Sequence, residues 1–208
     1  MKKGCFITIE GVEGVGKSTN IAAIESLLRA EGIPFISTRE PGGTPLSEKI
    51  RALLLDKNET AMHDKAELLL VFAARAQHVE ALIKPALEKG QWVICDRFTD
   101  SSFAYQGFGR QSDISLIERV EKLALGDFVP DITFLLDLPV EIGLARASKR
   151  GELDRFESED LEFFNRVRDG FLIRAKADRT IIIDAGGSLA EIEKQIAIHI
   201  QARIKSWR

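Results

Sequence analysis

Short apolar runs recur along the chain, separated by longer segments in which apolar residues repeat every three or four positions. The short runs are rich in β-branched and aromatic residues, a composition typical of strands that are buried on both faces of a sheet. Five strands are therefore predicted, at 5–10, 34–38, 92–96, 132–138 and 180–185.

The segments between these runs have the periodicity of amphipathic helices. The first, 18–31, has its apolar residues on one face and stops before Gly32, a typical C-terminal cap. Asp64, with Glu67 three residues later, and Ser158 are the expected starts of two further helices. The predicted helices after the first are 64–89, 112–125, 139–149, 158–176 and 188–206. Strands that alternate with helices predict an α/β fold with a parallel sheet covered on both faces.

Length and charge narrow the class of protein. The 208 residues, 45% of them hydrophobic, suffice for one domain with a sizeable core. The net charge of −3 provides no global basic field, so we expect no nucleic-acid partner. No stretch approaches the roughly twenty apolar residues of a membrane span, so we expect no membrane partner and a cytoplasmic location.

The two cysteines, Cys5 and Cys95, both lie inside apolar runs and are about ninety positions apart. Buried, reduced thiols are the favoured interpretation, ahead of a disulfide or a metal pair. Reduced thiols agree with a reducing compartment.

The segment "GVEGVGKS", 11–18, matches the pattern G-x-x-x-x-G-K-[ST] between a predicted strand and a predicted helix. Glycines allow backbone N–H groups to turn toward phosphate oxygens, and the helix N-terminus adds partial positive charge. Lys17 is expected to reach the β- and γ-phosphates, and the Ser18 hydroxyl to bind Mg²⁺. The residues predicted to bind ATP are Gly11, Val12, Glu13, Gly14, Val15, Gly16, Lys17, Ser18 and Thr19.

Phosphoryl transfer also needs an acid at the end of a strand to help hold the metal. Asp96 and Asp137 both follow apolar strands. Asp137 precedes Pro139 and could equally cap the next helix. Asp96 is the better candidate, because Arg97 beside it would put phosphate-binding chemistry next to the metal.

The motif at 11–18 is the phosphate-binding P-loop, which occurs in several classes of protein and does not by itself identify the reaction. The chain has no N-K-x-D string of the guanine-nucleotide switches and is short for a motor. A small phosphotransferase remains, and it needs a second phosphate site and a cover that excludes water. Arginines suit the second site because their fork matches phosphate oxygens. The charged connector 147–160 is a candidate cover, although charge alone would also fit a solvated loop.

Several segments together resemble bacterial thymidylate kinases of the P-loop nucleoside monophosphate kinase family. They are "IEGVEGVGKST", "TREPGGT", "CDRFTDSSFAYQG", "GDFVPDITFLLDL", "RGELDRFE" and "IIIDAGG". The resemblance implies a single domain, 1–208, with the three-layer P-loop NTPase fold and a lid at about 147–158. It further implies transfer of the γ-phosphoryl group of ATP to dTMP, with Mg²⁺, by a homodimer.

The resemblance also assigns the acceptor site. Arg97 would hold the dTMP phosphate, with Asp96 on the metal side, and an unusual peptide bond is expected before Pro41. Tyr105 would press against C2′ of the sugar and disfavour a ribose. Family members stack the base on a Phe four residues before an Arg, whereas here Val71 has that spacing from Arg75 and Phe72 lies three before it. The implied dTMP site is Arg39, Pro41, Arg51, Phe72, Arg75, Arg97, Ser102, Tyr105 and Gln106.

Glu13 places a carboxylate inside the anion cradle. Relatives with an acid at this position keep the catalytic arginine in the lid, which points to Arg150, with Lys149 and Arg155 as alternatives. A carboxylate beside phosphate would be repulsive by a few kcal/mol at an effective dielectric near 20. We therefore expect Glu13 to pair with an acceptor-side arginine or to hold a metal-bound water. The implied catalytic residues are Glu13, Lys17, Asp96, Arg97 and Arg150.

Two other functions stay open at this point. One is a regulator that binds nucleotide without turnover, although the presence of Lys17, Ser18, Asp96 and Arg97 speaks against it. The other is a nucleoside monophosphate kinase for a different acceptor base.

Overall fold

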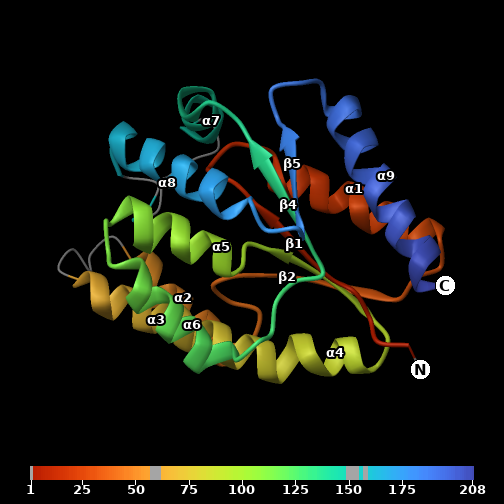
Figure 1. Cartoon of the computed structure of the whole chain (residues 1–208), viewed down its shortest axis with the longest axis horizontal. Coiled ribbons are helices and arrows are strands. Elements are labelled where there is room, and N and C mark those ends of the chain that lie inside the picture. Colours follow the sequence, from red (N-terminus) through yellow and green to blue (C-terminus); the bar gives the residue numbers. More distant parts are fainter. Residues whose placement is uncertain (1, 57–61, 149–154, 157–158) are drawn as a thin grey trace.

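The computed structural model describes residues 2–56, 62–148, 155–156 and 159–208. Its centre is a parallel sheet of five strands in the order β2-β3-β1-β4-β5 (Figure 1). The strands are β1 (Phe6–Glu10), β2 (Phe35–Arg39), β3 (Trp92–Asp96), β4 (Ile132–Asp137) and β5 (Thr180–Asp184). All five agree with the predicted strands, within a residue or two at their ends.

Helices cover both faces of this sheet. α1 (Lys17–Ala30) and α9 (Leu189–Trp207) lie side by side on one face, and α3, α4 and α6 gather on the other (Figure 1). The remaining bounds are α2 (Pro45–Leu55), α3 (Asp64–His78), η1 (Val79–Ile83), α4 (Lys84–Glu88), α5 (Thr99–Ser102), η2 (Phe103–Gly109), α6 (Ile114–Leu125), α7 (Val140–Ala147) and α8 (Leu161–Arg174). The three-layer α/β architecture predicted from the pattern is confirmed.

The expectation that every strand is buried on both faces holds for the three inner strands only. β1, β3 and β4 are buried almost throughout, whereas β2 and β5 consist of half-buried and exposed residues, apart from the buried Ile183 in β5. The difference follows from position, because β2 and β5 are the two edges of the sheet.

α3 begins at Asp64 as predicted, but the capping residues of two helices differ from those expected. α3 is capped by His63, whose side chain accepts from the Lys65 N–H, so Asp64 is already the first helical residue. α8 is capped by Asp160, whose carboxylate accepts from the Phe163 N–H at 2.7 Å. Ser158, the expected cap of α8, lies outside the described residues. In both cases a side chain within two residues of the expected one accepts from an N–H group in the first turn of the helix.

The long predicted helix 64–89 is continuous but irregular. The π-helical turn η1 joins α3 to α4, and Pro85 stands in the first turn of α4. Proline has no N–H and clashes with the preceding turn of a regular α-helix, so a wider turn accommodates it.

The helical segments at 45–55 and 99–109 were not predicted. The signal for α2 was present, since Thr44 caps the helix and Pro45 is its first residue. The segment 99–109 had no such signal, because its polar residues Thr99 to Ser102 are buried and an amphipathic pattern is missing.

Within the part of the chain that the structure describes, no helix is long and apolar enough to cross a membrane.

Candidate active site

The P-loop lies between β1 and α1, as its motif requires. Gly11, Gly14 and Gly16 have positive φ angles of 138°, 73° and 91°. A Cβ on Gly14 would lie 1.9 Å from the Gly143 carbonyl oxygen, so only glycine fits there. The Lys17 ammonium folds back over the loop and donates to the carbonyls of Gly11 at 3.2 Å and Val12 at 2.9 Å. The loop therefore has the backbone geometry of an anion cradle.

Seven of the nine predicted ATP-binding residues fall into two groups. Glu13, Gly14, Gly16, Lys17 and Ser18 line a cleft at the carboxyl edge of the sheet. The side chains of Val12 and Val15 instead pack in the hydrophobic core, so these two residues offer only their backbone to a ligand. Thr19 is exposed in the first turn of α1.

Glu13 is paired with an arginine, as expected. Its Oε1 accepts from Arg97 Nη2 at 2.5 Å and from the Tyr105 hydroxyl at 2.8 Å. Its Oε2 lies 3.9 Å from Lys17 Nζ. Burial lowers the pKa of Arg97, but the surrounding acidic groups, Glu13 first among them, together outweigh this and raise the pKa above its ordinary value. Arg97 therefore stays charged, and Glu13 joins the cradle to the opposite wall of the cleft.

The backbone of Arg97 has a left-handed conformation. Its φ angle is +69°, which is rare for a residue with a side chain. Arg97 Nη1 donates to the Gly11 carbonyl at 2.9 Å and to Ser101 Oγ at 3.2 Å. The turn thus aims the guanidinium back across the sheet edge at the P-loop.

Asp96 and Asp137 have different surroundings. Asp96 lines the cleft together with Lys17 and Ser18, and its buried Oδ1 has no hydrogen-bond partner among the described residues. Asp137 accepts two hydrogen bonds from Arg168, each 2.8 Å long. The alternative that Asp137 caps the next helix is wrong, because Pro139 is the residue at the start of α7. Asp96 is the acid that stands beside the cradle.

The opposite wall of the cleft carries the arginines expected for an acceptor site. The peptide bond between Glu40 and Pro41 is cis, which confirms the expectation of an unusual bond. Arg51 Nη1 donates to the Pro41 carbonyl at 2.8 Å. The predicted acceptor residues that line the cleft are Arg39, Pro41, Arg51, Arg75, Arg97, Ser102, Tyr105 and Gln106.

Phe72 is the exception in this predicted acceptor set. It is 2% exposed and packs with Leu68, Phe103 and Ile117, and Val71 lines the cleft instead. Its ring lies 4.7 Å from the Arg75 guanidinium carbon. Because α3 turns about 100° per residue, a spacing of three rather than four before Arg75 places Phe72 behind the arginine. This arrangement does not support base stacking on Phe72.

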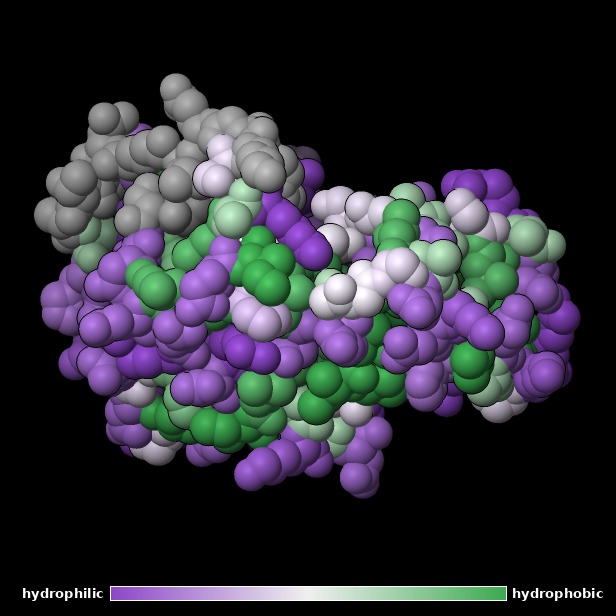
Figure 2. Space-filling model, turned by 90° about the horizontal axis from the view of Figure 1, so that it is seen from above, coloured by the Kyte–Doolittle hydropathy of each residue, from purple (hydrophilic) through white to green (hydrophobic). Residues whose placement is uncertain are grey.

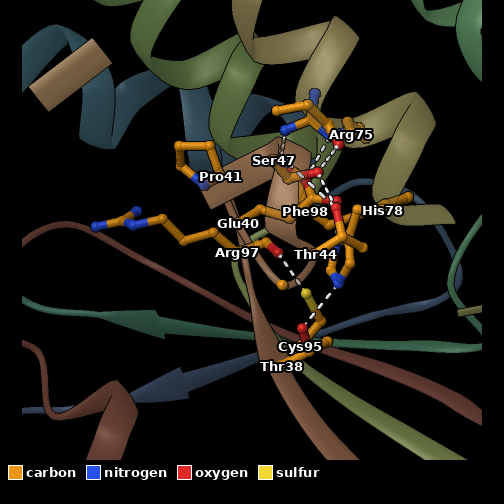
Figure 3. A network of polar contacts seen from close by, with 12 residues as sticks. Thr38, Glu40, Pro41, Thr44, Ser47, Arg75, His78, Cys95, Arg97 and Phe98 are labelled. Carbon is orange, nitrogen blue, oxygen red and sulfur yellow. Dashed lines mark hydrogen bonds and ion pairs between the residues drawn. The ribbon is translucent and has the colours of Figure 1, made fainter. Parts of the chain in front are cut away.

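Arg75 is buried and tightly held. Its Nε donates to Glu40 Oε2 at 2.5 Å, Nη1 to Ser102 Oγ at 2.8 Å, and Nη2 to the Phe98 carbonyl at 3.0 Å. Figure 3 shows these contacts converging from α3, from the loop after β2 and from the segment after β3. The orientation of Arg75 at the cleft is thus set by three separate segments.

Sequence reasoning missed three buried residues around the cleft. Glu10 accepts from the Phe98 N–H at 2.7 Å and from the Ser101 hydroxyl at 2.6 Å. Burial, with a smaller contribution from Asp100, raises its pKa to about 7. Glu40 and His78 form a pair 3.0 Å apart. An acid or imidazole inside an apolar pattern is the only signal that could have marked these residues.

The lid candidates are only partly described. Lys149 and Arg150 lie outside the described residues. Arg155 is directed at the acceptor side, where it forms an ion pair of 2.7 Å with the buried Glu67 and donates to the Leu54 carbonyl. Phe156 lines the cleft, and its ring centre lies 6.0 Å from that of Tyr105. The arrangement does not support Arg155 as the catalytic lid cation.

Both cysteines are buried free thiols, as predicted. Burial raises the pKa of Cys5 to about 12 and that of Cys95 well above its usual range. Neither thiol is therefore a reactive nucleophile.

The site combines a P-loop cradle, a facing wall of arginines and Asp96, whose buried Oδ1 has no hydrogen-bond partner among the described residues. Together these features define a P-loop phosphotransferase with a separate anionic acceptor. Comparison with known proteins narrows the class. The pattern of the thymidylate kinase family matches residues 9–196. The chain therefore belongs to the thymidylate kinase family, whose members transfer the γ-phosphoryl group of ATP to dTMP.

Individual relatives agree with this membership. The chain is 54% identical to a thymidylate kinase of Teredinibacter turnerae, over 96% of this chain and 98% of that protein. It is 50% identical to a thymidylate kinase of Hahella chejuensis, over 98% and 99% of the two chains. The crystal structure of thymidylate kinase from Ehrlichia chaffeensis superposes with a TM-score of 0.77 at 36% identity, covering 96% of this chain and 99% of that one.

Proposed function

We propose that this protein phosphorylates dTMP to dTDP with ATP, and that the two walls of its cleft bind one nucleotide each. The observation that carries the proposal is the Glu13–Arg97 pair, which joins the phosphate cradle to the arginine wall at 2.5 Å. Two phosphate-binding walls that meet at one cleft match a transfer between two bound nucleotides. The proposal assigns donor and acceptor to opposite sides of this pair.

On the donor side, the P-loop N–H groups and Lys17 hold the phosphates of ATP. Burial lowers the pKa of Lys17, and the carbonyls of Gly11 and Val12 fix its ammonium over the loop. When bound, Mg²⁺ would neutralise charge on the phosphates, and the Ser18 hydroxyl and Asp96 would hold it. The donor set fits this hard cation, because both residues offer oxygen and the buried Asp96 Oδ1 has no hydrogen-bond partner in the described chain.

On the acceptor side, Arg97 holds the dTMP phosphate. The turn after β3 aims this arginine at the P-loop, and the acids around it, Glu13 first, keep it charged. Glu13 orients that arginine before the acceptor arrives. Arg75 faces the base and Tyr105 the sugar, with Arg39, Arg51, Ser102 and Gln106 around them. Val71 lines the cleft beside Arg75, and its small side chain leaves room there for the base.

We further propose that the chain is one domain whose lid, about 147–158, closes over the nucleotides and brings Arg150 to the transferring phosphoryl group. The need for such a cation supports this assignment, because among the described cradle residues Lys17 is the cation that faces the donor phosphates. Phe156, at the far end of the lid, already lines the cleft.

The protein is proposed to act as a cytoplasmic homodimer. Exposed leucines on three neighbouring helices support the dimer: Leu46 and Leu53 on α2, Leu69 on α3 and Leu123 on α6, which are 51%, 51%, 59% and 87% exposed. Figure 2 shows that hydrophobic residues also gather in patches between hydrophilic ones on the surface it displays. The two free thiols agree with a reducing compartment.

A coupled assay that detects ADP tests the reaction. With ATP and Mg²⁺, turnover of dTMP should exceed that of dUMP, UMP, CMP, AMP and GMP. A preference for another monophosphate would replace dTMP as the acceptor, and no turnover with any of them would favour a nucleotide-binding regulator. Lys17→Ala should abolish the signal, whereas Lys122→Ala, a surface lysine paired with Asp127, serves as the matched control.

A further inference from the structure

A buried chain of polar side chains runs behind the acceptor wall, from β2 through the following loop to α3. His78 Nε2 lies 2.7 Å from Thr38 Oγ1, and His78 Nδ1 lies 3.0 Å from Glu40 Oε1. The other carboxylate oxygen, Glu40 Oε2, accepts from Arg75 Nε at 2.5 Å. Figure 3 shows the imidazole between Thr38 and the Glu40 carboxylate.

The hydrogen-bonding roles in this chain have a fixed direction at one point. Glu40 pairs with Arg75 as a carboxylate, so it can only accept hydrogen bonds. The proton in the contact between Glu40 and His78 therefore belongs to His78 Nδ1. The side chains of His78, Glu40 and Arg75 are 0%, 2% and 3% exposed. In such a dry environment a carboxylate that lost one partner would be costly, so both contacts hold Glu40 in one rotamer.

His78 also supports the loop that follows β2. A Cβ placed on Gly43 would lie 2.4 Å from His78 Nε2 and 2.5 Å from Thr38 Oγ1. Gly43 has a φ angle of +86°, so a side chain there would be strained as well. The backbone of this loop therefore rests directly on the His78–Thr38 pair. The same loop contains Pro41, which lines the cleft.

His78 does not line the cleft, but Arg75 does. The three bonds of Arg75 to Glu40, Ser102 and Phe98 use three of its five N–H groups. One N–H on each Nη remains for a ligand. Their direction is set by the plane of the guanidinium, and Glu40 Oε2 fixes that plane at Nε.

We propose that His78 is a positioning residue for the acceptor site: through Glu40 it orients the Arg75 guanidinium and supports the Pro41–Gly43 loop. This inference rests on the proposed placement of dTMP at Arg75. His78 itself touches neither nucleotide. Its removal should therefore weaken the binding of dTMP and leave that of ATP almost unchanged.

The same cluster could be interpreted as a metal site, because Cys95 joins Glu40 and His78 with ligand atoms within 4.8 Å of one another. The contacts favour the positioning role. Both Glu40 oxygens and both His78 nitrogens already have partners, and the Cys95 thiol donates to the Arg97 carbonyl at 3.1 Å. A second cation would also have to displace Arg75 from Glu40.

A pair of substitutions of similar size separates the two bonds of His78. In His78→Asn the amide nitrogen takes the place of Nδ1 and keeps the bond to Glu40, whereas in His78→Gln the amide oxygen takes the place of Nε2 and keeps the bond from the Thr38 hydroxyl. His78→Leu removes both. Steady-state KM for dTMP and for ATP, each at saturating partner substrate, is the measurement.

The KM for dTMP should rise about tenfold or more in His78→Leu and His78→Gln, since a hydrogen bond to a charged group is lost. It should stay within about threefold of the natural value in His78→Asn. The KM for ATP should change by less than about twofold in all three. Equal rises in both KM values, or rescue by Gln and not by Asn, would overturn the proposal.

A double substitution distinguishes failure of this inference from failure of the proposed site. Arg75→Lys keeps a cation beside Glu40 but loses the planar fork. If Arg75 binds dTMP, this variant alone raises the KM for dTMP, and adding His78→Leu raises it little further. An unchanged KM in Arg75→Lys alone would contradict the acceptor site. Full additivity would contradict the coupling through Glu40 and hence the role of His78.

Cys95→Ala is the matched control. Cys95 is equally buried and belongs to the same cluster, but it has no hydrogen bond to Glu40. The variant should leave the KM for dTMP within about twofold of the natural chain, although the small cavity lowers the thermal midpoint. Thermal midpoints of all variants show whether each one is folded. If His78→Leu does not fold, the comparison of His78→Asn with His78→Gln still decides.

Discussion

The two walls of the cleft are built by different means. The donor wall is one continuous stretch, 11–18, whose glycines present backbone groups. The acceptor wall is assembled from β2, α2, α3 and the segment after β3, and buried charged side chains hold it together. The structure of the donor wall thus depends on backbone conformation, whereas that of the acceptor wall depends on the pairing of buried charges away from water.

Because of this difference, substitutions in the two walls should affect different kinetic constants. A substitution in the cradle should remove an electrostatic contact of the transition state and lower kcat. A substitution in the acceptor network should disturb orientation and raise the KM for dTMP. Glu13 and Glu10 connect the two walls, so changes there should affect both.

The largest effect is expected for Lys17→Ala. The loss of the cation over the phosphates should reduce kcat by about 10³ or more. Steady-state kinetics with the Lys122→Ala control would measure it. Substantial remaining activity would mean that the cradle does not hold the transferring phosphate.

Arg150→Ala tests whether the lid completes the donor wall. If this arginine contacts the phosphoryl group only in the transition state, kcat should fall by about a hundredfold or more and ATP affinity should stay nearly unchanged. Arg146→Ala, an exposed arginine on α7, is the control. A kcat equal to that of the natural chain would show that Arg150 is not the catalytic cation.

The connection between the walls should make stability depend on pH. The pKa of Glu10 rises from 4.5 to about 7 on folding, so the folded protein favours the protonated carboxyl. The stability from this group is complete below about pH 4.5 and is lost as the pH rises through about 7. Between about pH 5 and 8, the free energy of unfolding should fall by roughly 3 kcal/mol more in the natural chain than in Glu10→Gln.

Denaturant unfolding at several pH values would measure this difference. Thr8→Val, which removes a buried hydrogen bond in the same strand, controls for a general loss of stability. Parallel pH profiles for the natural chain and Glu10→Gln would refute the raised pKa.

The smallest effect is expected at Tyr105, on the acceptor wall alone. Its ring lines the cleft, and its hydroxyl donates to Glu13. Tyr105→Ala should reduce the ratio of kcat/KM for dUMP to that for UMP, which differ only in the 2′-hydroxyl, by about tenfold. Tyr105→Phe should change the ratio by less than about threefold, because the ring remains. An unchanged ratio in Tyr105→Ala would end the proposed role at the sugar.

Much of the fold could be predicted because its signals are local. All five strands and the helices α1, α3, α6, α7, α8 and α9 follow from runs and periodicity in contiguous residues. The helix caps were less predictable, since His63 and Asp160 compete with neighbours of similar chemistry. The segment 99–109 was not predictable from amphipathic periodicity, because it is buried among the helices α8, α6 and α3.

The donor wall could be predicted in full, because its glycines, Lys17 and Ser18 all lie within the single stretch 11–18. The sequence also marked Arg97 and Asp96 as chemistry at a strand end. The folded structure, by contrast, was needed to show that Val71 rather than Phe72 lines the cleft and that Glu13 binds Arg97. It alone placed His78 and Glu40 behind Arg75, because such contacts join distant segments whose relative positions arise from packing.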